Sequence, residues 1–232
     1  MNYAIIAAGE GSRLAQEGVK LPKPLVKLNG VALIDRLIDI FEKNNASSIT
    51  VIVNEEMLQV QEHLKNKKLS VPFNLVVKST PSSMHSFFEL SKFLEGERFC
   101  LTTVDTIFKE DEFAKYIAFC EKAGAEEGVM AVTDYIDDEK PLYIKTDNQN
   151  QIENFLDQND GTCKYISGGI YCLTPKAIDV LKDAMDNNIH RMRNYQRLLA
   201  EKGLKLTAFP FAKIVDVDHA EDIEKAEAFL RS

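Results

Sequence analysis

Short apolar runs alternate with amphipathic stretches along the first half of the chain. The apolar runs have the length of buried strands and fall at residues 3–8, 48–54, 73–78 and 98–104. The stretches between them repeat apolar residues at helical spacing, which predicts helices at residues 32–44, 55–67 and 82–94. Strands that alternate with helices in this order are typical of a parallel sheet with helices on both faces. We therefore expect a three-layer α/β fold that binds its ligands at the carboxyl ends of the strands.

The pattern changes after a further helix at residues 110–123. Closely spaced strands follow, separated by Asp, Asn and Gly turns, at residues 128–135, 141–146, 151–156 and 164–173. The remainder predicts helices at 175–187, 194–202 and 220–230 and strands at 204–209 and 213–217. We expect these strands to form a small mixed or antiparallel extension of the sheet, which could wall a second substrate. With 232 residues the chain fits a single domain.

The first strand leads into a glycine-bearing loop, Gly9-Glu10-Gly11-Ser12-Arg13, that is suited to hold phosphate. Glycines let the backbone approach a ligand closely, so that successive amides can surround phosphate oxygens. Arg13 and Lys23 add positive charge, and the prolines on either side of Lys23 restrict where it points. A dinucleotide fingerprint does not fit, because Leu14 replaces its third small residue, and the Walker A pattern is absent. A plain strand-to-helix turn is the alternative interpretation of the glycine pair alone.

The charge of the whole chain limits its partners. The net charge is −8, although the stretch from Gly9 to Leu28 carries more cations than acids. This balance argues against general nucleic-acid binding, which usually requires a basic face. The sequence has no secretory signal and no apolar stretch of about 20 residues, so we expect a cytoplasmic protein without a membrane anchor. The four cysteines and four histidines lack metal-site spacing, which favours buried, reduced thiols.

Two acidic positions could hold a metal ion. Asp105 ends an apolar strand, where a carboxylate either pairs with a cation such as Mg²⁺ or caps the following helix. Further along, Asp216 and Asp218 share one face of an extended segment. We assign Asp216 to the metal. Asp218 directly precedes the last predicted helix, so capping of that helix is at least as plausible for it as ligation.

These motifs occur in a characteristic order: AAGEGSR, LPKPL, a strand-end Asp105, SGGIY at residues 167–171 and VDVDHAEDI at residues 215–223. The set resembles the nucleotidyltransferases that make NDP-sugars and CDP-alcohols, in which the pattern runs LAAGxGTR, PKxL, a strand-end Asp, NAGIY and DIDTPEDL. The resemblance covers the chain almost end to end. It implies a Rossmann-like, GT-A-like sheet, with a nucleotide-binding half at residues 1–125. Residues 126–232 would then bind the acceptor and add the second metal ligand.

The resemblance also implies roles for single residues. Arg13 and Lys23 match the cations that neutralise the triphosphate and the reacting α-phosphorus. Asp105 and Asp216 match the Mg²⁺ ligands, and Gly168 with Gly169 matches the acceptor-side glycine turn. The nucleotide would be held at Ala7, Ala8, Gly9, Gly11, Ser12, Ser82 and Ser83. The two serines replace a GT-type pair that contacts base and ribose in the family, so the base of the NTP stays open.

The implied reaction is in-line attack by an acceptor phosphate on the α-phosphorus of an NTP, with release of pyrophosphate. A sugar-1-phosphate and phosphocholine are the two acceptors to compare. Residues 155–158 read FLDQ where hexose-phosphate enzymes carry FxEK, and a choline group would favour an aromatic cage, to which the chain could contribute Tyr135, Tyr143, Tyr165 and Tyr171.

Other interpretations of the same residues stay open. The basic run at residues 190–195 could hold the acceptor phosphate, although charged turns are more often solvated. The whole chain could be a non-catalytic nucleotide-binding or regulatory module on the same fold. A glycosidase that uses Asp105 and Asp216 is a third possibility, but it would leave the cationic loop without a role.

Overall fold

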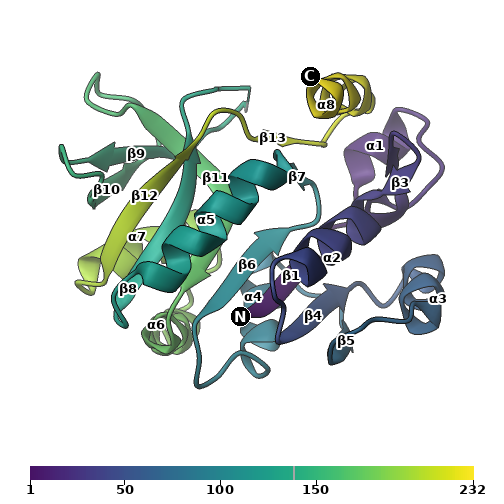
Figure 1. The fold of residues 1–232 in the computed structure, drawn as a ribbon, viewed down its shortest axis with the longest axis horizontal. Coiled ribbons are helices and arrows are strands. Elements are labelled where there is room, and N and C mark those ends of the chain that lie inside the picture. The colour runs from purple at the N-terminus through teal and green to yellow at the C-terminus, as the bar shows by residue number, and fades with distance from the viewer. Residues whose placement is uncertain (138) are drawn as a thin grey trace.

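A nine-stranded sheet runs through the middle of the computed structural model, which describes residues 1–137 and 139–232 (Figure 1). Its parallel part consists of β1 (Asn2–Ala7), β4 (Ser48–Val53), β5 (Phe73–Val77) and β6 (Phe99–Thr103). β4 and β6 flank β1 on opposite sides, so the order of strands reverses at β1. In sheets of this kind a ligand cleft lies at that switch point, outside the carboxyl ends of the strands.

The second half of the chain extends the same sheet with strands of both directions, of which β10 and β11 run opposite to the parallel part. These strands are β8 (Glu127–Thr133), β9 (Tyr143–Thr146), β10 (Ile152–Leu156), β11 (Tyr165–Leu173) and β12 (Lys205–Phe211). β11 pairs antiparallel with β6, and β12 pairs parallel with β8. The predicted mixed extension is therefore confirmed, and it is continuous with the parallel sheet through the β6–β11 pair.

β11 carries a bulge at the two glycines of the SGGIY motif. Ser167 lies opposite Val132 of β8, and Tyr171 lies opposite Met130. Between these two pairs β11 therefore has two residues more than β8. Such a bulge bends a strand and re-aims its side chains. At Gly168 a Cβ atom would clash with Cδ1 of Ile214 and lie 3.1 Å from the carbonyl oxygen of Ala131, so a side chain here would require its neighbours to shift.

The central strand separates two hydrophobic cores. Tyr3, Ile5 and Ala7 of β1 face one core, and the intervening Ala4 and Ile6 face the other. The helices follow this division. The first core receives α2 (Leu33–Lys43), α3 (Leu58–Asn66), α5 (Glu110–Lys122) and α8 (Ala220–Arg231). The second receives α4 (Ser83–Ser91), α6 (Pro175–Asp186) and α7 (Met192–Glu201).

The hydrophobic pattern predicted every one of these strands and helices, with small differences at their ends. The helix expected from residue 55 begins at Leu58, and the strand expected at 213–217 shortens to β13 (Val215–Asp216). The pattern missed the smallest elements, which are α1 (Ser12–Gln16), the 3₁₀ turn η1 (Lys23–Leu25), β2 (Lys27–Leu28), β3 (Val31–Ala32) and β7 (Thr106–Ile107). None of the helices in the described part of the chain is long and apolar enough to cross a membrane.

We expect Gly168→Ala to destabilise the protein by about 1–3 kcal/mol, because the added methyl group overpacks the contact with Ile214. Gly124→Ala is the matched control, since its Cβ would meet Glu127 at an ordinary 3.7 Å. Urea unfolding measures both. Ile214→Val removes the clashing methyl group, so it should cost less stability in the Gly168→Ala background than in the wild type. Equal costs in the two backgrounds would contradict the steric explanation.

Candidate active site

A cavity of about 520 Å³ opens at the carboxyl ends of β1, β4, β5 and β6. Each of these strands contributes residues at its end or in the loop that follows it. The wall is formed by the loop from Ala8 to Arg13, by Asn54, by the segment Thr80 to Ser83, and by Thr103 to Asp105. Lys23 and Asp218 join this wall from η1 and from the segment before α8. The cavity thus occupies the switch point of the sheet, where the strand order predicts a ligand.

Gly11 sets the shape of the glycine loop. Its backbone is left-handed, with φ +63°, and it precedes the short helix α1. A Cβ atom at Gly11 would lie 2.9 Å from Cβ of Lys23, so a larger residue would push that lysine aside. Glycine is therefore required both for the turn and for the approach of Lys23. The loop and its cation form one packed unit.

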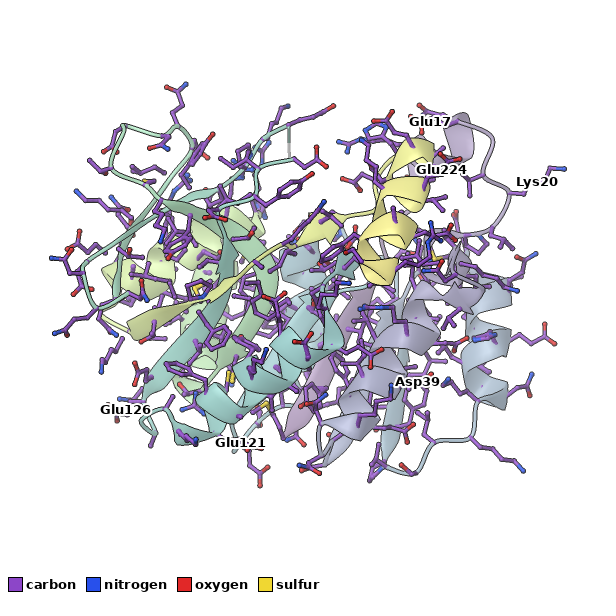
Figure 2. All side chains as sticks on the ribbon, turned by 45° about the horizontal axis from the view of Figure 1, so that its top comes forward. Glu17, Lys20, Asp39, Glu121, Glu126 and Glu224 are labelled. Carbon is purple, nitrogen blue, oxygen red and sulfur yellow. The ribbon has the colours of Figure 1, made fainter. Side chains whose placement is uncertain are left out.

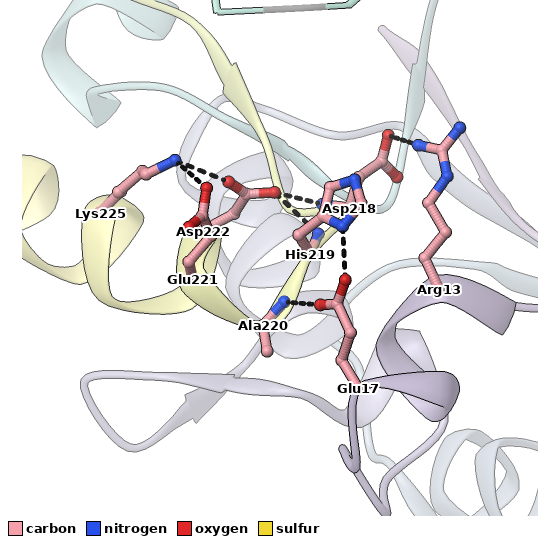
Figure 3. A network of polar contacts seen from close by, with 8 residues as sticks. All are labelled: Arg13, Glu17, Asp218, His219, Ala220, Glu221, Asp222 and Lys225. Atoms are coloured by element: carbon pink, nitrogen blue, oxygen red, sulfur yellow. Dashed lines mark hydrogen bonds and ion pairs between the residues drawn. The ribbon is translucent and has the colours of Figure 1, made fainter.

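The ammonium of Lys23 is the centre of the site. Its Nζ atom donates to Oδ2 of Asp105 and, at 2.7 Å, to Oδ1 of Asp218. The second oxygen of Asp218 accepts from Nη1 of Arg13 at 3.1 Å (Figure 3). Two cations and two carboxylates from four separate segments thus meet at one wall of the cavity.

Burial makes these contacts necessary. The Lys23 side chain is 10% exposed, whereas that of Asp218 is 44% exposed. Loss of water by itself would lower the pKa of Lys23, but the charge of Asp105 and the hydrogen bonds to Asp105 and Asp218 outweigh it and raise the pKa. Lys23 therefore stays protonated and can face phosphate oxygens as a fixed positive charge.

Asp218 is placed by the pairing of the C-terminal segment with the segment after β6. β13 pairs antiparallel with β7, and the amide of Val217 donates to the carbonyl oxygen of Asp105 at 3.1 Å. Strand pairing therefore brings the backbone of Val217 to Asp105. Asp216 does not line this cavity but lines two further cavities beside the sheet extension.

The start of α8 is tied to the glycine loop as well. The N-cap of α8 is His219, which shares a capping box with Asp222, so Asp218 does not cap this helix as the sequence had suggested. Glu17, at the end of α1, accepts from Nδ1 of His219 at 2.7 Å and from the amide of Ala220 at 2.6 Å (Figure 3). The hydrogen bond between the Glu17 and His219 side chains lowers the pKa of Glu17 and raises the pKa of His219. Figure 2 shows Glu17 beside α8, whereas Lys20 points away from the molecule.

The opposite wall of the cavity is the start of α4. Ser82 is the N-cap residue, and its hydroxyl oxygen accepts from the amide of His85 at 3.5 Å. Ser82 and Ser83 line the cavity as predicted. Asn54 lies nearby and is fixed by its side-chain oxygen, which accepts from the amide of Glu56 at 2.9 Å. Sequence reasoning overlooked Asn54, although it follows β4 as the glycine loop follows β1.

Two smaller cavities adjoin this one on the side of the sheet extension. The first, of about 320 Å³, shares Arg13 and Asp218 with the large cavity and includes Gly168. The second, of about 340 Å³, shares Ser82, Ser83 and Thr103 with it and includes Gly169. The two predicted acceptor-side glycines therefore lie where a second substrate could reach the large cavity.

Most of the predicted site residues are thus brought together. The large cavity collects Ala8, Gly9, Gly11, Ser12, Arg13, Lys23, Ser82, Ser83 and Asp105. Ala7 lies outside it, because its side chain is buried in the first core at the end of β1. On the acceptor side, the sequence reasoning overlooked the polar pair Gln196 and Ser167, which line the smaller cavity together.

The carboxylates at Lys23 form a donor set that fits a hard divalent cation. Asp105 and Asp218 both direct an oxygen at the same ammonium, so a positive charge already lies between them. Mg²⁺ is typically held by one or two carboxylates and completes its coordination with water and substrate phosphates. Within residues 1–137 and 139–232 no group of three or more His, Cys, Asp or Glu could hold a metal ion. A metal at Asp105 and Asp218 would therefore depend on the bound substrate for further ligands.

The arrangement defines a class of protein: an α/β fold with a glycine loop, cations and carboxylates gathered at the switch point of a parallel sheet. Residues 3–232 match the family model described as nucleotidyl transferase. The chain belongs to this family.

Relatives of known identity agree with this assignment. The chain is 21% identical to the bifunctional protein GlmU of Thermodesulfovibrio yellowstonii over 100% of its own length and 52% of the relative. It is 23% identical to the bifunctional IPC transferase and DIPP synthase of Aquifex aeolicus, with 97% and 51% covered. The chain thus spans about half the length of these curated relatives.

The fold agrees with a solved structure over its whole length. The inositol-1-phosphate CTP transferase of T. maritima superposes with a TM-score of 0.82 at 18% identity, covering 100% of this chain and 96% of the other. The expected fold class, with its parallel sheet and mixed extension, is confirmed.

We expect Gly11→Ala to weaken nucleotide binding by displacing Lys23, and to destabilise the fold by about 1–2 kcal/mol through its left-handed backbone. Gly18→Ala is the control, because Gly18 also has a positive φ but no atom within 4 Å of an added Cβ. Both variants should lose stability in urea unfolding. Calorimetric titration with Mg-NTP should show weaker binding for Gly11→Ala alone, and equal weakening in both would contradict the role of the Lys23 contact.

Proposed function

We propose that this chain transfers a nucleotidyl group from an NTP to the phosphate of a small-molecule acceptor, a sugar-1-phosphate in the first place, and releases pyrophosphate. The observation that carries the proposal is the Lys23 ammonium shared by Asp105 and Asp218 in the wall of the glycine-loop cavity. The chain's family membership supports the same reaction. The acceptor side adjoins the large cavity through residues common to both.

In this reaction an oxygen of the acceptor phosphate forms a bond to the α-phosphorus of the NTP. The bond from the α-phosphorus to the oxygen bridging to the β-phosphorus breaks, and pyrophosphate leaves with that electron pair. An ionised phosphate is already a nucleophile, so catalysis requires positioning and charge neutralisation rather than a base. The structure provides fixed charge for this task in Arg13 and Lys23 and amide donors in the glycine loop.

We assign the nucleotide to the large cavity. Its phosphates would lie against Gly9, Gly11 and Ser12, with Ala8 at the start of the loop and backbone contact from Ala7. Ser82 and Ser83 would face the base and ribose from the opposite wall. This division gives residues 1–125 the nucleotide and residues 126–232 the acceptor, with Gly168 and Gly169 on the acceptor side.

We place a magnesium ion at Asp105 and Asp218 and give Asp216 a role toward the acceptor. When bound, Mg²⁺ supplies neutralisation of phosphate charge and a template that orients the reacting groups. The choice of Asp218 over Asp216 rests on the contacts of Lys23, which reach Asp105 and Asp218. Arg13, which also holds Asp218, would keep that carboxylate at the edge of the cavity.

The surroundings of the tyrosines favour a hydroxylated acceptor over a choline. Lys213 lies over the ring of Tyr135 at 4.0 Å, and Lys164 lies over the ring of Tyr165 at 4.8 Å, so two of the four tyrosines already have a cation against one ring face. The 340 Å³ cavity instead presents hydroxyl and amide groups that are hydrogen-bonded to one another. The hydroxyl of Ser167 donates to Gln196 at 3.0 Å, and the amide of Gln196 donates to the Tyr171 hydroxyl at 3.3 Å.

We expect Lys23→Ala to lower kcat by about 10²–10³-fold, because it removes a preorganised charge at the reacting phosphorus. Lys20→Ala, which removes an exposed lysine outside the cavity wall, should retain activity within about two-fold of the wild type. The assay is pyrophosphate release from CTP, UTP, dTTP, GTP and ATP against a panel of sugar-1-phosphates and phosphocholine. If the wild type binds an NTP yet releases no pyrophosphate with any acceptor, the chain is a non-catalytic nucleotide-binding module.

Metal dependence separates the two candidate carboxylates. Chelation with EDTA should abolish activity, and Mg²⁺ should restore it. Asp218→Asn should raise the Mg²⁺ concentration for half-maximal rate by about 10-fold or more, since it removes a direct ligand. Asp216→Asn should leave that concentration nearly unchanged and raise the KM for the acceptor. The reverse pattern would return the second metal site to Asp216.

A further inference from the structure

Basic side chains line the 340 Å³ cavity at the start of α7. Lys140, Arg191 and Arg193 all contribute to its wall, and Asp216 is the one acid among the described residues that line it. The rest of the wall is polar or apolar and uncharged. A positively charged pocket next to a nucleotide site needs an explanation, since the phosphate loop already has its own cations.

Arg193 is held rigidly in this wall. Its Nη1 donates to Oδ1 of Asp157 at 2.7 Å, and its Nη2 donates to the carbonyl oxygen of Lys140 at 2.9 Å. The same Asp157 oxygen also pairs with Nη2 of Arg197 at 2.7 Å. Because one carboxylate serves two guanidinium groups, the cluster keeps a net positive charge. A guanidinium held in place in this way still has N–H donors left for a carboxylate or a phosphate.

Arg191 is placed beside Arg193 by a stacked pair of histidines. The ring of His190 stacks on that of His85, with centroids 5.5 Å apart and planes within 11°. His85 in turn shares a hydrogen bond of 2.8 Å with the hydroxyl of Ser82. Through this chain of contacts the segment before α7 is fixed against the start of α4, and Arg191 faces the cavity wall next to Ser82. Arg191 is exposed, and within residues 1–137 and 139–232 it forms no ion pair.

The position of these arginines separates them from the transferring phosphate. The α-phosphorus must lie with Lys23 and Asp105, and the cavity lined by that pair includes neither Arg191 nor Arg193. Arg193 also lines the 320 Å³ cavity. Of the three cavities described, Arg191 lines only the one of 340 Å³. Ser82 and Thr103 line both the large cavity and the 340 Å³ cavity. An anion bound by both arginines would therefore lie on the other side of these residues from the α-phosphorus.

On the basis of the proposed function, we propose that Arg191 and Arg193 form a subsite for a second anionic group on the acceptor, a phosphate or carboxylate distinct from the phosphate that attacks the NTP. The preferred acceptor is then a hydroxylated molecule with negative charge at two ends. The Ser167–Gln196–Tyr171 network lines the same cavity and would bind hydroxyl groups between them. Lys140, in the same cavity wall, would add positive charge near the second anion.

Calorimetric titration with matched ligands tests the subsite without turnover. The probes are glucose 1-phosphate and mannose 1-phosphate, each compared with its 1,6-bisphosphate, at constant ionic strength. The wild type should bind at least one bisphosphate about 10-fold or more tightly than the corresponding monophosphate. Arg191→Gln should abolish this difference and leave the affinity for the monophosphate within about two-fold. Lys202→Gln, at the other end of α7, removes an exposed cation outside the cavity and should preserve the difference.

Two results would overturn the proposal. Equal affinity of the wild type for mono- and bisphosphates would show that no second anion is bound. An equal loss of affinity for both ligands in Arg191→Gln would show that Arg191 binds the single phosphate common to them. A different result bears on the reaction itself: a preserved bisphosphate preference without pyrophosphate release from any NTP would refute the nucleotidyl transfer but support the subsite.

Discussion

The buried ammonium of Lys23 is the interaction on which the rest of the site depends. A charge that has lost most of its water is stable only when opposite charges and hydrogen bonds replace that water. Asp105 and Asp218 fill this requirement, and each comes from a different part of the chain. Position 11 requires glycine because a side chain there would clash with the same lysine. The loop, the strand end after β6 and the segment before α8 are therefore fixed together by one cation.

The sheet explains why these groups can meet. The carboxyl ends of the parallel strands deliver the glycine loop, Asn54, the Ser82 turn and Asp105 to one edge. β11, which runs antiparallel beside β6, brings its glycine bulge to the same edge from the other side. Because the strands β6 and β11 are direct neighbours, the large cavity shares wall residues with the two smaller ones. The mixed direction of the sheet is thus what brings these cavities together, and in the proposed reaction they would hold the donor and the acceptor.

Much of this could be predicted from the sequence, and what could not be predicted has physical reasons. The strands and main helices follow from apolar periodicity, and the loop chemistry follows from Gly11, Arg13 and Lys23. Asp216 and Asp218 share one face of an extended segment in the sequence, so periodicity could not tell which of them reaches Asp105. That choice depends on the pairing of β13 with β7, a long-range contact between two-residue strands without a local signal. The position of the basic run before α7 depends in the same way on a long-range contact, the His85–His190 stack.

The contact between Arg13 and Asp218 joins residues 205 positions apart. Closing so long a segment costs chain entropy, which the packing of the sheet and helices between the two residues has to offset. During synthesis the N-terminal loop leaves the ribosome long before its carboxylate partners exist. Until the segment around Asp218 docks, Lys23 has one of its two partners and α1 lacks its anchor at His219. The wall of the glycine-loop cavity is therefore complete only after the segment around Asp218 has docked on it.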